Sequence, residues 1–367
     1  MKLKKILQTV DPNLLRIFLP WALRHPSSLN QYQKLVKPFM KSLEMRRDFK
    51  SNEILIPPFM ILSITKNCNL KCAGCYASAV GTLNCDSKKK QLNIDDWKKI
   101  IKEANDLGVF GYIIAGGEPF LYPNLLELCE EFKDRLFIII TNGTKISDEN
   151  FKWLKKLRNT VIMVSLEGER EITNQRRGIG VYEKASGTIK KLNKFGVLNG
   201  VSVTITQSNH EQWMNPDLID ELIEKGIRIA FFIEYISSDP QIDSSLILTT
   251  SQRALFRKRM LEYRAEKKIY LIHSPGDEEL FGGCVSAGKG FAHVTPYGDL
   301  TPCPVSNVAT HNLKTDSLKD GLASDLFRLI RENEHLLETE GTPCALFAHQ
   351  AEVKKLAGRV GAYFVDE

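Results

Sequence analysis

Six short apolar runs recur along the chain, and their rhythm constrains the fold more than any other feature of the sequence. The runs are nearly continuous rather than alternating, which is typical of parallel strands covered on both faces. They span Met60–Thr65, Tyr112–Ala115, Leu136–Thr141, Val161–Leu166, Val201–Thr206 and Ile229–Tyr235. Helical patterns separate them, over Asp95–Leu107, Asn124–Phe132, Asp148–Leu157, Tyr182–Phe195 and Pro216–Ile223. With right-handed crossovers, this order predicts an α/β fold, a partial (β/α)6 TIM-type barrel.

Three closely spaced cysteines follow the first of these runs. Cys68, Cys72 and Cys75 have the spacing C-x3-C-x2-C and offer three thiolates from one short loop. A structural zinc site uses four closed ligands, whereas a [4Fe–4S] cluster held by three cysteines keeps one iron open to a ligand that is not protein. The spacing alone also fits zinc loops and ferredoxin-type loops. The position of this loop, directly after a predicted strand, favours a catalytic site, because barrel enzymes place their active sites at the carboxyl ends of the strands.

Polar and glycine-rich motifs follow the next three runs. They are Gly116-Gly117-Glu118-Pro119, Thr141-Asn142-Gly143 and Ser165-Leu166-Glu167-Gly168. Together with the cysteine loop, these motifs resemble the radical S-adenosylmethionine (SAM) superfamily over residues 55–240. One departure is Gly74, because the family usually has an aromatic residue just before the third cysteine. Here an aromatic residue, Tyr76, follows that cysteine instead.

The resemblance implies a [4Fe–4S] cluster and SAM as cofactors, with SAM chelated by the open iron. The cofactor-binding candidates are Gly116, Gly117, Glu118, Asn142, Ser165, Glu167 and Arg177. The first three would receive the SAM amine. Asn142, Ser165 and Glu167 could contact the ribose or the methionine carboxylate, although such side chains also cap loops routinely. Arg177 and its neighbour Arg176 could pair with that carboxylate or be solvated loop charges.

Beyond residue 281 the sequence becomes rich in Gly, Pro and Cys, which indicates a small module over residues 281–367. This segment resembles the Twitch/SPASM type of extension, which carries auxiliary iron–sulfur clusters. Its metal-ligand candidates are Cys284, Cys303 and Cys344. The resemblance implies one auxiliary [4Fe–4S] cluster, whose fourth iron is open or bound by a residue such as His293 or His311. A zinc site or uncoordinated thiols are the alternatives.

The two remaining cysteines have other settings. Cys129 falls on the apolar stripe of its helix and is expected to be a buried small hydrophobic residue. Cys85 is expected to be a surface thiol, with a substrate-facing or redox role as the alternative.

Positive charge is concentrated near the amino terminus. Residues 1–50 hold eleven Lys and Arg against three Asp and Glu, a net charge of +8, so that the rest of the +6 chain carries −2. A short helix is predicted over Pro12–Leu19, capped by Asp11 and broken near Pro20. Its apolar stripe, which includes Phe18 and Trp21, either packs on the domain or meets an anionic membrane or a lipid-like substrate.

The chain divides into four predicted parts. Residues 1–54 form a basic helical extension, residues 55–240 the partial barrel, residues 241–280 a linking helix and strand, and residues 281–367 the cluster module. No apolar run reaches the roughly 20 residues of a membrane span, and no secretory cleavage site follows the amino-terminal segment. Close-set cysteines suit metal ligation in a reducing compartment. We therefore expect a cytoplasmic protein.

These features predict an enzyme that reductively cleaves SAM to a 5′-deoxyadenosyl radical. The radical would abstract hydrogen from a peptide, a tetrapyrrole or a small metabolite. One alternative is modification of a lipid or isoprenoid at a membrane surface, and another is a non-catalytic iron–sulfur protein in electron transfer or sensing. The glycine-rich motif argues against the last, since an electron carrier needs no SAM pocket. The expected partners are a reducing protein such as flavodoxin or ferredoxin and the substrate, with no nucleic acid and with possible membrane contact through the amino terminus.

Overall fold

A ten-stranded sheet dominates the structure. The structure is a computed structural model that describes residues 12–26, 33–51, 54–80, 89–237, 244–339 and 341–365. Two residues singled out above, Asp11 and Cys85, lie outside the described residues. The strand order in the sheet is β11-β9-β8-β1-β2-β3-β4-β5-β6-β7.

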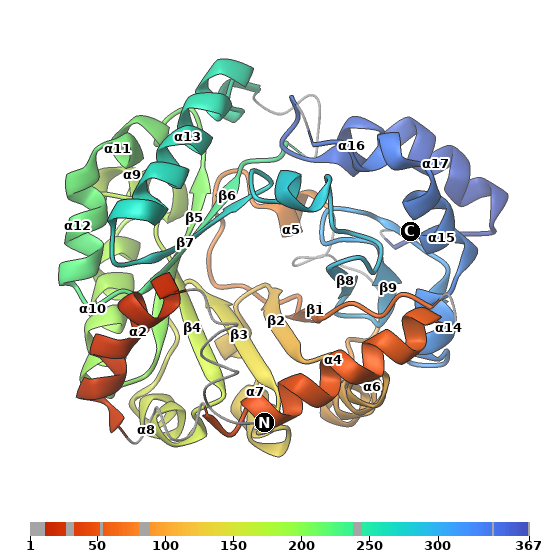
Figure 1. Cartoon of the computed structure of the whole chain (residues 1–367), viewed down its shortest axis with the longest axis horizontal. Helices are drawn as coiled ribbons and strands as arrows, with labels where there is room; N and C mark the ends of the chain where they lie inside the picture. Colours follow the sequence, from red (N-terminus) through yellow and green to blue (C-terminus); the bar gives the residue numbers. More distant parts are fainter. Residues whose placement is uncertain are drawn as a thin grey trace.

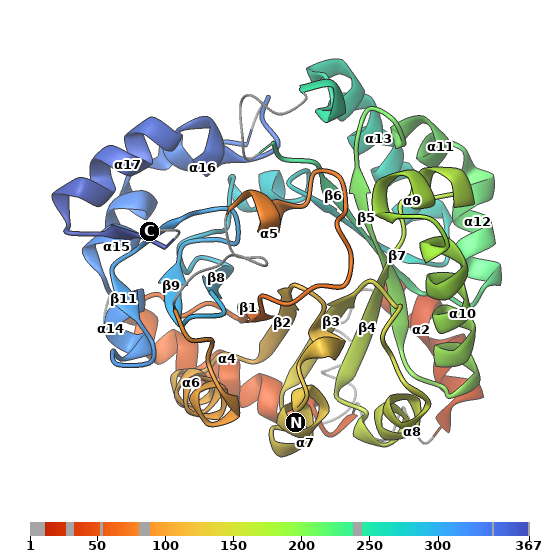
Figure 2. The same cartoon turned by 180° about the vertical axis from the view of Figure 1, so that it is seen from behind.

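The six predicted strands are present and pair in parallel in chain order, as the partial barrel requires. They are β1 (Phe59–Thr65), β2 (Gly111–Gly116), β3 (Leu136–Thr141), β4 (Thr160–Ser165), β5 (Asn199–Ile205) and β6 (Ile229–Glu234). The sheet curves strongly in both views (Figures 1 and 2). Parallel pairing brings all six carboxyl ends to one edge, where the predicted site residues follow the strands.

Helices connect these strands, and the longer ones cover the outer face of the curved sheet (Figure 1). The connections contain α5 (Tyr76–Ala79), α6 (Ile94–Leu107), η1 (Pro119–Leu121), α7 (Leu125–Glu131), α8 (Asp148–Leu157), α9 (Arg170–Arg177), α10 (Val181–Lys194), α11 (His210–Met214) and α12 (Pro216–Glu224). Capping boxes at Asn93 and Ser147 fix where α6 and α8 begin. Cys129 of α7 is fully buried, as predicted.

The two faces of the central strands belong to different apolar clusters. In β4, Ile162 and Val164 join the main core under the outer helices, whereas Val161 and Met163 join a second cluster on the opposite face. This alternation follows from the period of two along a strand. Phe18 and Trp21 of α2 (Pro12–Arg24) pack against that second cluster.

The first helix differs from its prediction, because α2 continues through Pro20 to Arg24. A proline removes one backbone donor from a helix and is expected to interrupt it. Here Ile17 before Pro20 and Ala22 after it are both buried. Packing on both sides of the proline therefore keeps the helix continuous.

The sheet extends beyond the six strands at both edges. After η2 (Ser244–Leu246) and α13 (Thr250–Glu266), β7 (Tyr270–Ser274) pairs in parallel with β6. At the other edge, β8 (Phe291–Val294) pairs in parallel with β1. Strands β9 (Asp299–Thr301) and β11 (His311–Asn312) continue that edge in antiparallel pairing. The carboxyl-terminal segment is thus joined to the first strand of the barrel.

Short elements complete the carboxyl-terminal segment beside this edge (Figure 2). They are η3 (Glu278–Phe281), β10 (Val308–Ala309), α14 (Leu318–Leu322), α15 (Asp325–Glu332), η4 (Glu334–Leu337), α16 (Ala345–Ala348), α17 (Gln350–Arg359) and β12 (Tyr363–Phe364). The buried apolar residues of α14, α15, η4, α16 and α17 belong to the same core as those of the parallel strands, whereas Leu280 and Phe281 of η3 are exposed. The module boundary at residue 281 stays a prediction.

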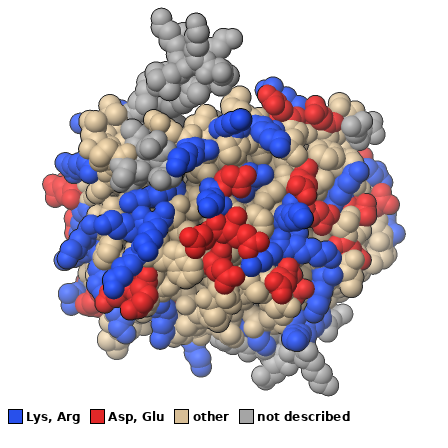
Figure 3. Space-filling view, turned by 90° about the horizontal axis from the view of Figure 1, so that it is seen from below, with Lys and Arg blue, Asp and Glu red and all other residues tan. Residues whose placement is uncertain are grey.

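On the face seen from below in Figure 3, Lys and Arg side chains are interspersed with Asp and Glu.

The second amino-terminal helix, α4 (Val36–Ser51), packs against the end of α6, where Ser42 Oγ donates to the Gly108 carbonyl at 2.7 Å. No helix in the described part of the chain has both the length and the apolar character needed to cross a membrane.

Candidate functional site

The loop after β1 carries Cys68, Cys72 and Cys75, and each of these side chains is partly buried. Burial raises the pKa of the Cys68 thiol, and the neighbouring Cys72 and Cys75 act in the same direction. The three thiols share one partly buried loop, and as these side chains stand no three His, Cys, Asp or Glu groups of the described residues are placed to hold a single metal ion. Thiolates disfavoured by burial and by one another are stabilised by a cation placed among them. The donor set fits an iron–sulfur cluster held by three cysteines.

The motif after β2 lies directly against the cysteine loop. Gly117 N donates to Thr65 O, and Glu118 N donates to Asn67 O, both at 2.8 Å. A Cβ added at Gly117 would lie 2.1 Å from Asn67 O. Glycine is therefore required for this close approach of the two backbone segments, which places the motif after β2 beside the cysteine loop.

Glu118 is 1% exposed, and its carboxylate points to the end of β3. It accepts hydrogen bonds from Thr141 Oγ1 at 2.7 Å, Asn142 N at 2.8 Å and Phe120 N at 3.1 Å. Burial raises the pKa of this carboxyl, while these bonds act in the opposite direction. An ionised carboxylate offers about four acceptor positions, so one position remains for a further donor.

Asn142 links the end of β3 to the cysteine loop. Its Nδ2 donates to Asn69 Oδ1 at 3.1 Å, and its Oδ1 accepts from Thr144 N at 2.9 Å. Asn142 therefore caps the loop, which was the alternative role considered for it. One of its bonds reaches Asn69, which lies between Cys68 and Cys72. Ser165 ends β4 opposite Ser202 of β5.

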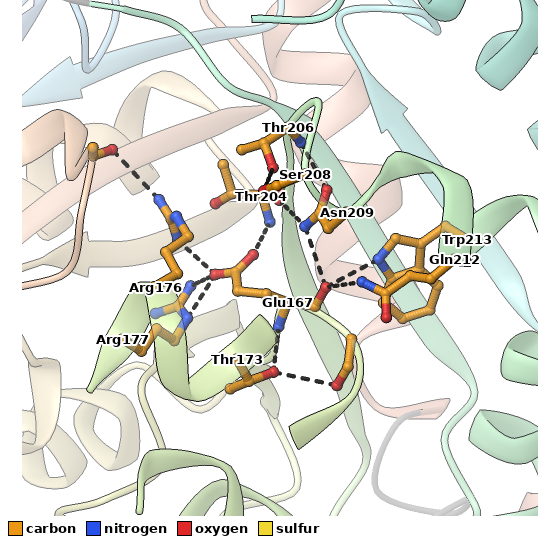
Figure 4. Close-up of polar contacts among 12 residues, drawn as sticks. Glu167, Thr173, Arg176, Arg177, Thr204, Thr206, Ser208, Asn209, Gln212 and Trp213 are labelled. Atoms are coloured by element: carbon orange, nitrogen blue, oxygen red, sulfur yellow. Dashed lines mark hydrogen bonds and ion pairs between the residues drawn. The ribbon is translucent and has the colours of Figure 1, made fainter. Parts of the chain in front are cut away.

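Glu167 is the centre of a buried polar cluster behind the loop (Figure 4). Its Oε1 accepts from Arg176 Nη1 at 2.5 Å and from Arg177 Nε at 2.6 Å, while Oε2 accepts from Thr204 N at 2.9 Å. Burial alone would raise the pKa of Glu167, but Arg177 and Arg176 hold it below its ordinary value. The carboxylate that Arg177 contacts in this structure is thus Glu167, a partner that the sequence did not predict.

Helix α9 brings this cluster to the cysteine loop. Ala73 N donates to Arg176 O at 2.9 Å, and Arg176 Nη2 donates to Gly74 O at 3.4 Å. Burial raises the pKa of Cys72, and Arg177 and Arg176 oppose that effect. The two guanidinium groups therefore supply positive charge beside one candidate ligand of the cluster.

Tyr235 explains why the residue before the third cysteine is a glycine. Gly74 has a φ of +63°, and a Cβ there would lie 2.5 Å from Tyr235 Cε2. Tyr235 follows β6, where its N–H donates to Ile205 O at 2.8 Å, and it is 5% exposed. The only signal in the sequence was indirect, a small residue where the family usually has an aromatic one.

The second set of cysteines lies in the carboxyl-terminal segment. Cys284 and Cys303 are buried and Cys344 is partly buried. Burial raises the pKa of Cys303, and both Cys344 and Cys284 add to that effect. As these side chains stand, no three His, Cys, Asp or Glu groups within the described ranges are placed to hold a single metal ion.

Of the two histidines considered as a fourth ligand, His293 is bonded through both ring nitrogens and His311 through one. His293 forms hydrogen bonds through both ring nitrogens, with Ser63 Oγ and with Thr301 Oγ1, each at 2.8 Å. It has no free nitrogen, because it bridges β1, β8 and β9. His311 bonds Thr310 Oγ1 through Nδ1 at 2.9 Å.

Comparison with known proteins gives a family match and several relatives. Residues 62–222 match the model of the Radical SAM superfamily. The antilisterial bacteriocin subtilosin biosynthesis protein AlbA of Bacillus subtilis (strain 168) is 28% identical over 268 residues, which are 69% of this chain and 56% of that protein. The Fe-coproporphyrin III synthase of Methanosarcina barkeri (strain Fusaro / DSM 804) is 31% identical over 179 residues, 48% of this chain and 43% of that protein. The chain thus spans about half the length of both relatives.

Solved structures share the fold at low sequence identity. SuiB of Streptococcus suis bound to precursor peptide SuiA has a TM-score of 0.65 at 21% identity, over 78% of this chain and 70% of that chain. SuiB bound to S-adenosylmethionine has a TM-score of 0.63 at 22% identity, with the same shares of the two chains. The predicted fold class, a partial TIM-type barrel, is confirmed by this likeness.

Proposed function

Since residues 62–222 form a radical SAM domain, we propose that this protein is an enzyme that cleaves SAM and abstracts hydrogen from a precursor peptide. Cys68, Cys72 and Cys75 would hold a [4Fe–4S] cluster, which when bound supplies the electron that converts SAM to methionine and a 5′-deoxyadenosyl radical. The observation that carries the proposal is the packing of the Gly117 and Glu118 backbone directly against the loop that carries the three cysteines, at the ends of the first two strands.

The residues around this loop have distinct roles in the proposal. The remaining acceptor position of Glu118 would receive the SAM ammonium, and its three existing bonds fix the carboxylate in place. Gly116 and Gly117 let this motif lie directly against the backbone of Thr65 and Asn67, which holds it beside the cysteine loop. Asn142 positions the loop through Asn69. Glu167 orients Arg177 and Arg176, whose charge stabilises the Cys72 thiolate.

The carboxyl-terminal cysteines would hold an auxiliary [4Fe–4S] cluster. Their mutual interaction and their burial support this role. An electron from a reducing protein such as flavodoxin or ferredoxin would start each turnover.

A precursor peptide is the substrate class best supported by the relatives. AlbA is named for bacteriocin biosynthesis, and SuiB binds a precursor peptide. A tetrapyrrole is the second candidate, on the name of the Methanosarcina relative. The packing of Phe18 and Trp21 against the sheet argues against a lipid-like substrate met through that helix.

Anaerobic incubation with SAM and dithionite tests the proposal. The reconstituted protein should release 5′-deoxyadenosine, and Cys72→Ala should reduce the product to background because it removes a cluster ligand. Cys129→Ala is the matched control, since Cys129 is buried in α7 away from the loop and should leave the yield unchanged. Wild-type protein that binds iron but forms no 5′-deoxyadenosine would favour an electron-transfer or sensor protein.

A further inference from the structure

A surface pocket with three lysines lies at the β9–β11 edge of the sheet. Its volume is about 550 Å³, within the range of about 300–1,000 Å³ that is usual for ligand sites. The segment before α6 forms one wall of the pocket, and the two strands with the residues after them form the other. The residues that matter below are Lys89, Lys90, Asp299, Asn312, Lys314 and Tyr363.

The pocket lies on the same side of the sheet as the end of β1, which is the mouth of the barrel. Strand β8 pairs in parallel with β1, so the turn from β8 to β9 is on the side where β1 ends (Figure 2). Gln91, next in the chain after two pocket lysines, accepts hydrogen bonds from Lys66 N at 2.7 Å and Thr65 Oγ1 at 3.2 Å. Leu92 N donates to Pro296 O of that turn at 2.8 Å. The pocket therefore adjoins the start of the cysteine loop.

The carboxylates at the pocket are bound by neutral donors. Asp299 is 2% exposed, and its Oδ1 accepts from Tyr363 OH and Asn312 Nδ2, each at 2.9 Å. Its Oδ2 accepts from Thr295 Oγ1, also at 2.9 Å. Asp316, beside the pocket, accepts from Asn312 N at 2.8 Å. In the part of the chain that the structure describes, no lysine forms an ion pair with either carboxylate.

The lysines leave an excess of positive charge. Lys90 and Lys314 are exposed, and no described Asp or Glu side chain forms an ion pair with them. Lys89 also lines the pocket, and its Nζ donates to Val365 O at 3.1 Å. Three ammonium groups therefore stand against the two carboxylates described above. Such a surface favours a partner that carries negative charge.

We propose that this pocket binds an acidic side chain of the precursor peptide and so holds the peptide across the mouth of the barrel. The inference rests on the peptide substrate of the proposed function. A carboxylate is the negative group that Asp and Glu supply in a peptide, and ammonium groups pair with it directly. The ring of Tyr363, 37% exposed, adds apolar surface for the methylene groups of that side chain.

Sheet geometry gives the expected position of the acidic residue in the peptide. Strand β9 lies two places from β1 in the sheet. Neighbouring strands are about 4.8 Å apart, so the pocket is roughly 10 Å from β1 along the sheet. An extended peptide rises about 3.3 Å per residue. The acidic residue is therefore expected about three residues from the one that lies over the end of β1.

Peptide binding to the reconstituted protein tests the proposal. The probe is a fluorescein-labelled, carboxyl-amidated Gly/Ser peptide with two adjacent glutamates, and fluorescence anisotropy at low salt measures its affinity. The same peptide with glutamines should bind at least about fivefold more weakly. Lys90→Gln and Lys314→Gln should each weaken binding of the glutamate peptide about two- to fivefold. Lys314→Arg should bind it like the wild type, because the positive charge is kept.

Lys102→Gln is the matched control, because Lys102 is an exposed lysine of α6 that does not line the pocket. This variant should bind the glutamate peptide as the wild type does. Equal affinity for the two peptides would overturn the proposal, and so would wild-type affinity in the double variant of Lys90→Gln and Lys314→Gln.

The acidic residues Asp366 and Glu367 of the chain itself are the rival occupant. Binding that appears only when they are changed to Asn and Gln would assign the pocket to them and overturn the peptide assignment. SAM cleavage by the wild-type protein is measured separately. Its absence would remove the proposed function without altering the binding results.

Discussion

At the residue scale, Glu167 shows how one buried carboxylate organises charges from several elements. It binds Arg176, Arg177 and the backbone of Thr204, while its carbonyl accepts from Gln212 Nε2 at 3.1 Å and Trp213 Nε1 at 3.2 Å (Figure 4). Removing one partner of a buried ion pair leaves the other charges uncompensated. The cluster therefore contributes to stability as well as to the charge beside Cys72.

The pH dependence of stability tests this role of Glu167. Its folded pKa is lowered, so its contribution is fully present above the ordinary Glu pKa of about 4.3 and is lost as the pH falls through the folded pKa. Glu167→Gln should lower the free energy of unfolding by about 3–5 kcal/mol at pH 7, and this difference should shrink in acid. Glu183→Gln breaks an exposed pair with Arg170 and should change little at either pH. Urea unfolding of the apo-protein measures the free energy of unfolding of both variants. Equal decreases in that free energy for the two variants would contradict the prediction.

The Gly74–Tyr235 contact gives a second prediction at this scale. Gly74→Ala adds a Cβ in the left-handed region and places it against the Tyr235 ring. The loop between the second and third cysteines should shift, so the iron content of the first cluster should fall. In the double variant with Tyr235→Ala, part of the iron should return, because the steric clash is gone and only the backbone strain remains.

Gly180→Ala separates strain from clash in that experiment. Gly180 also has a positive φ, +79°, but nothing lies within 4 Å of an added Cβ. This variant should lose some stability and no iron. If Gly74→Ala behaves in the same way, the Tyr235 ring does not determine the residue at position 74.

At the scale of elements, α2 closes one face of the sheet rather than standing apart from it. Arg16 Nη2 donates to Ala265 O at 3.1 Å, which ties the helix to the end of α13, and its apolar stripe lies on the cluster of Val161, Met163 and Leu198. This packing explains why a basic segment carries an aromatic stripe, and the explanation requires no membrane contact.

Substitution of Trp21 tests the packing of α2. Trp21→Ala should lower the free energy of unfolding by about 0.5–3 kcal/mol, the usual range for lost packing, and leave vesicle binding at background. Leu23→Ala, at a residue of the same helix that is 71% exposed, should have little effect. The measurements are thermal unfolding and co-sedimentation with anionic vesicles. Salt-sensitive co-sedimentation that weakens in Trp21→Ala would instead indicate an interfacial helix.

At the scale of the whole molecule, the parallel sheet joins the two cysteine sets. Strand β1 pairs with β2 on one side and with β8 on the other. The loop after β1 carries the first set. In the second set, Cys284 precedes β8, Cys303 follows β9 and Cys344 directly precedes α16. His293 strengthens this junction by bonding Ser63 of β1 and Thr301 of β9. His293, which the sequence offered as a candidate cluster ligand, is thus a structural bridge between strands.

The sequence by itself determined the parts that depend on local pattern. Apolar periodicity specified the six strands and their helices, because strand and helix faces repeat every few residues. The spacing of Cys68, Cys72 and Cys75 and the glycines after β2 predicted the candidate site, since one loop and one turn contain them. Only the tertiary structure decided which distant side chains meet there. Arg177 pairs with Glu167, Tyr235 covers Gly74, and His293 bridges Ser63 and Thr301. These contacts depend on strand order and loop paths, and no periodicity within one segment encodes them.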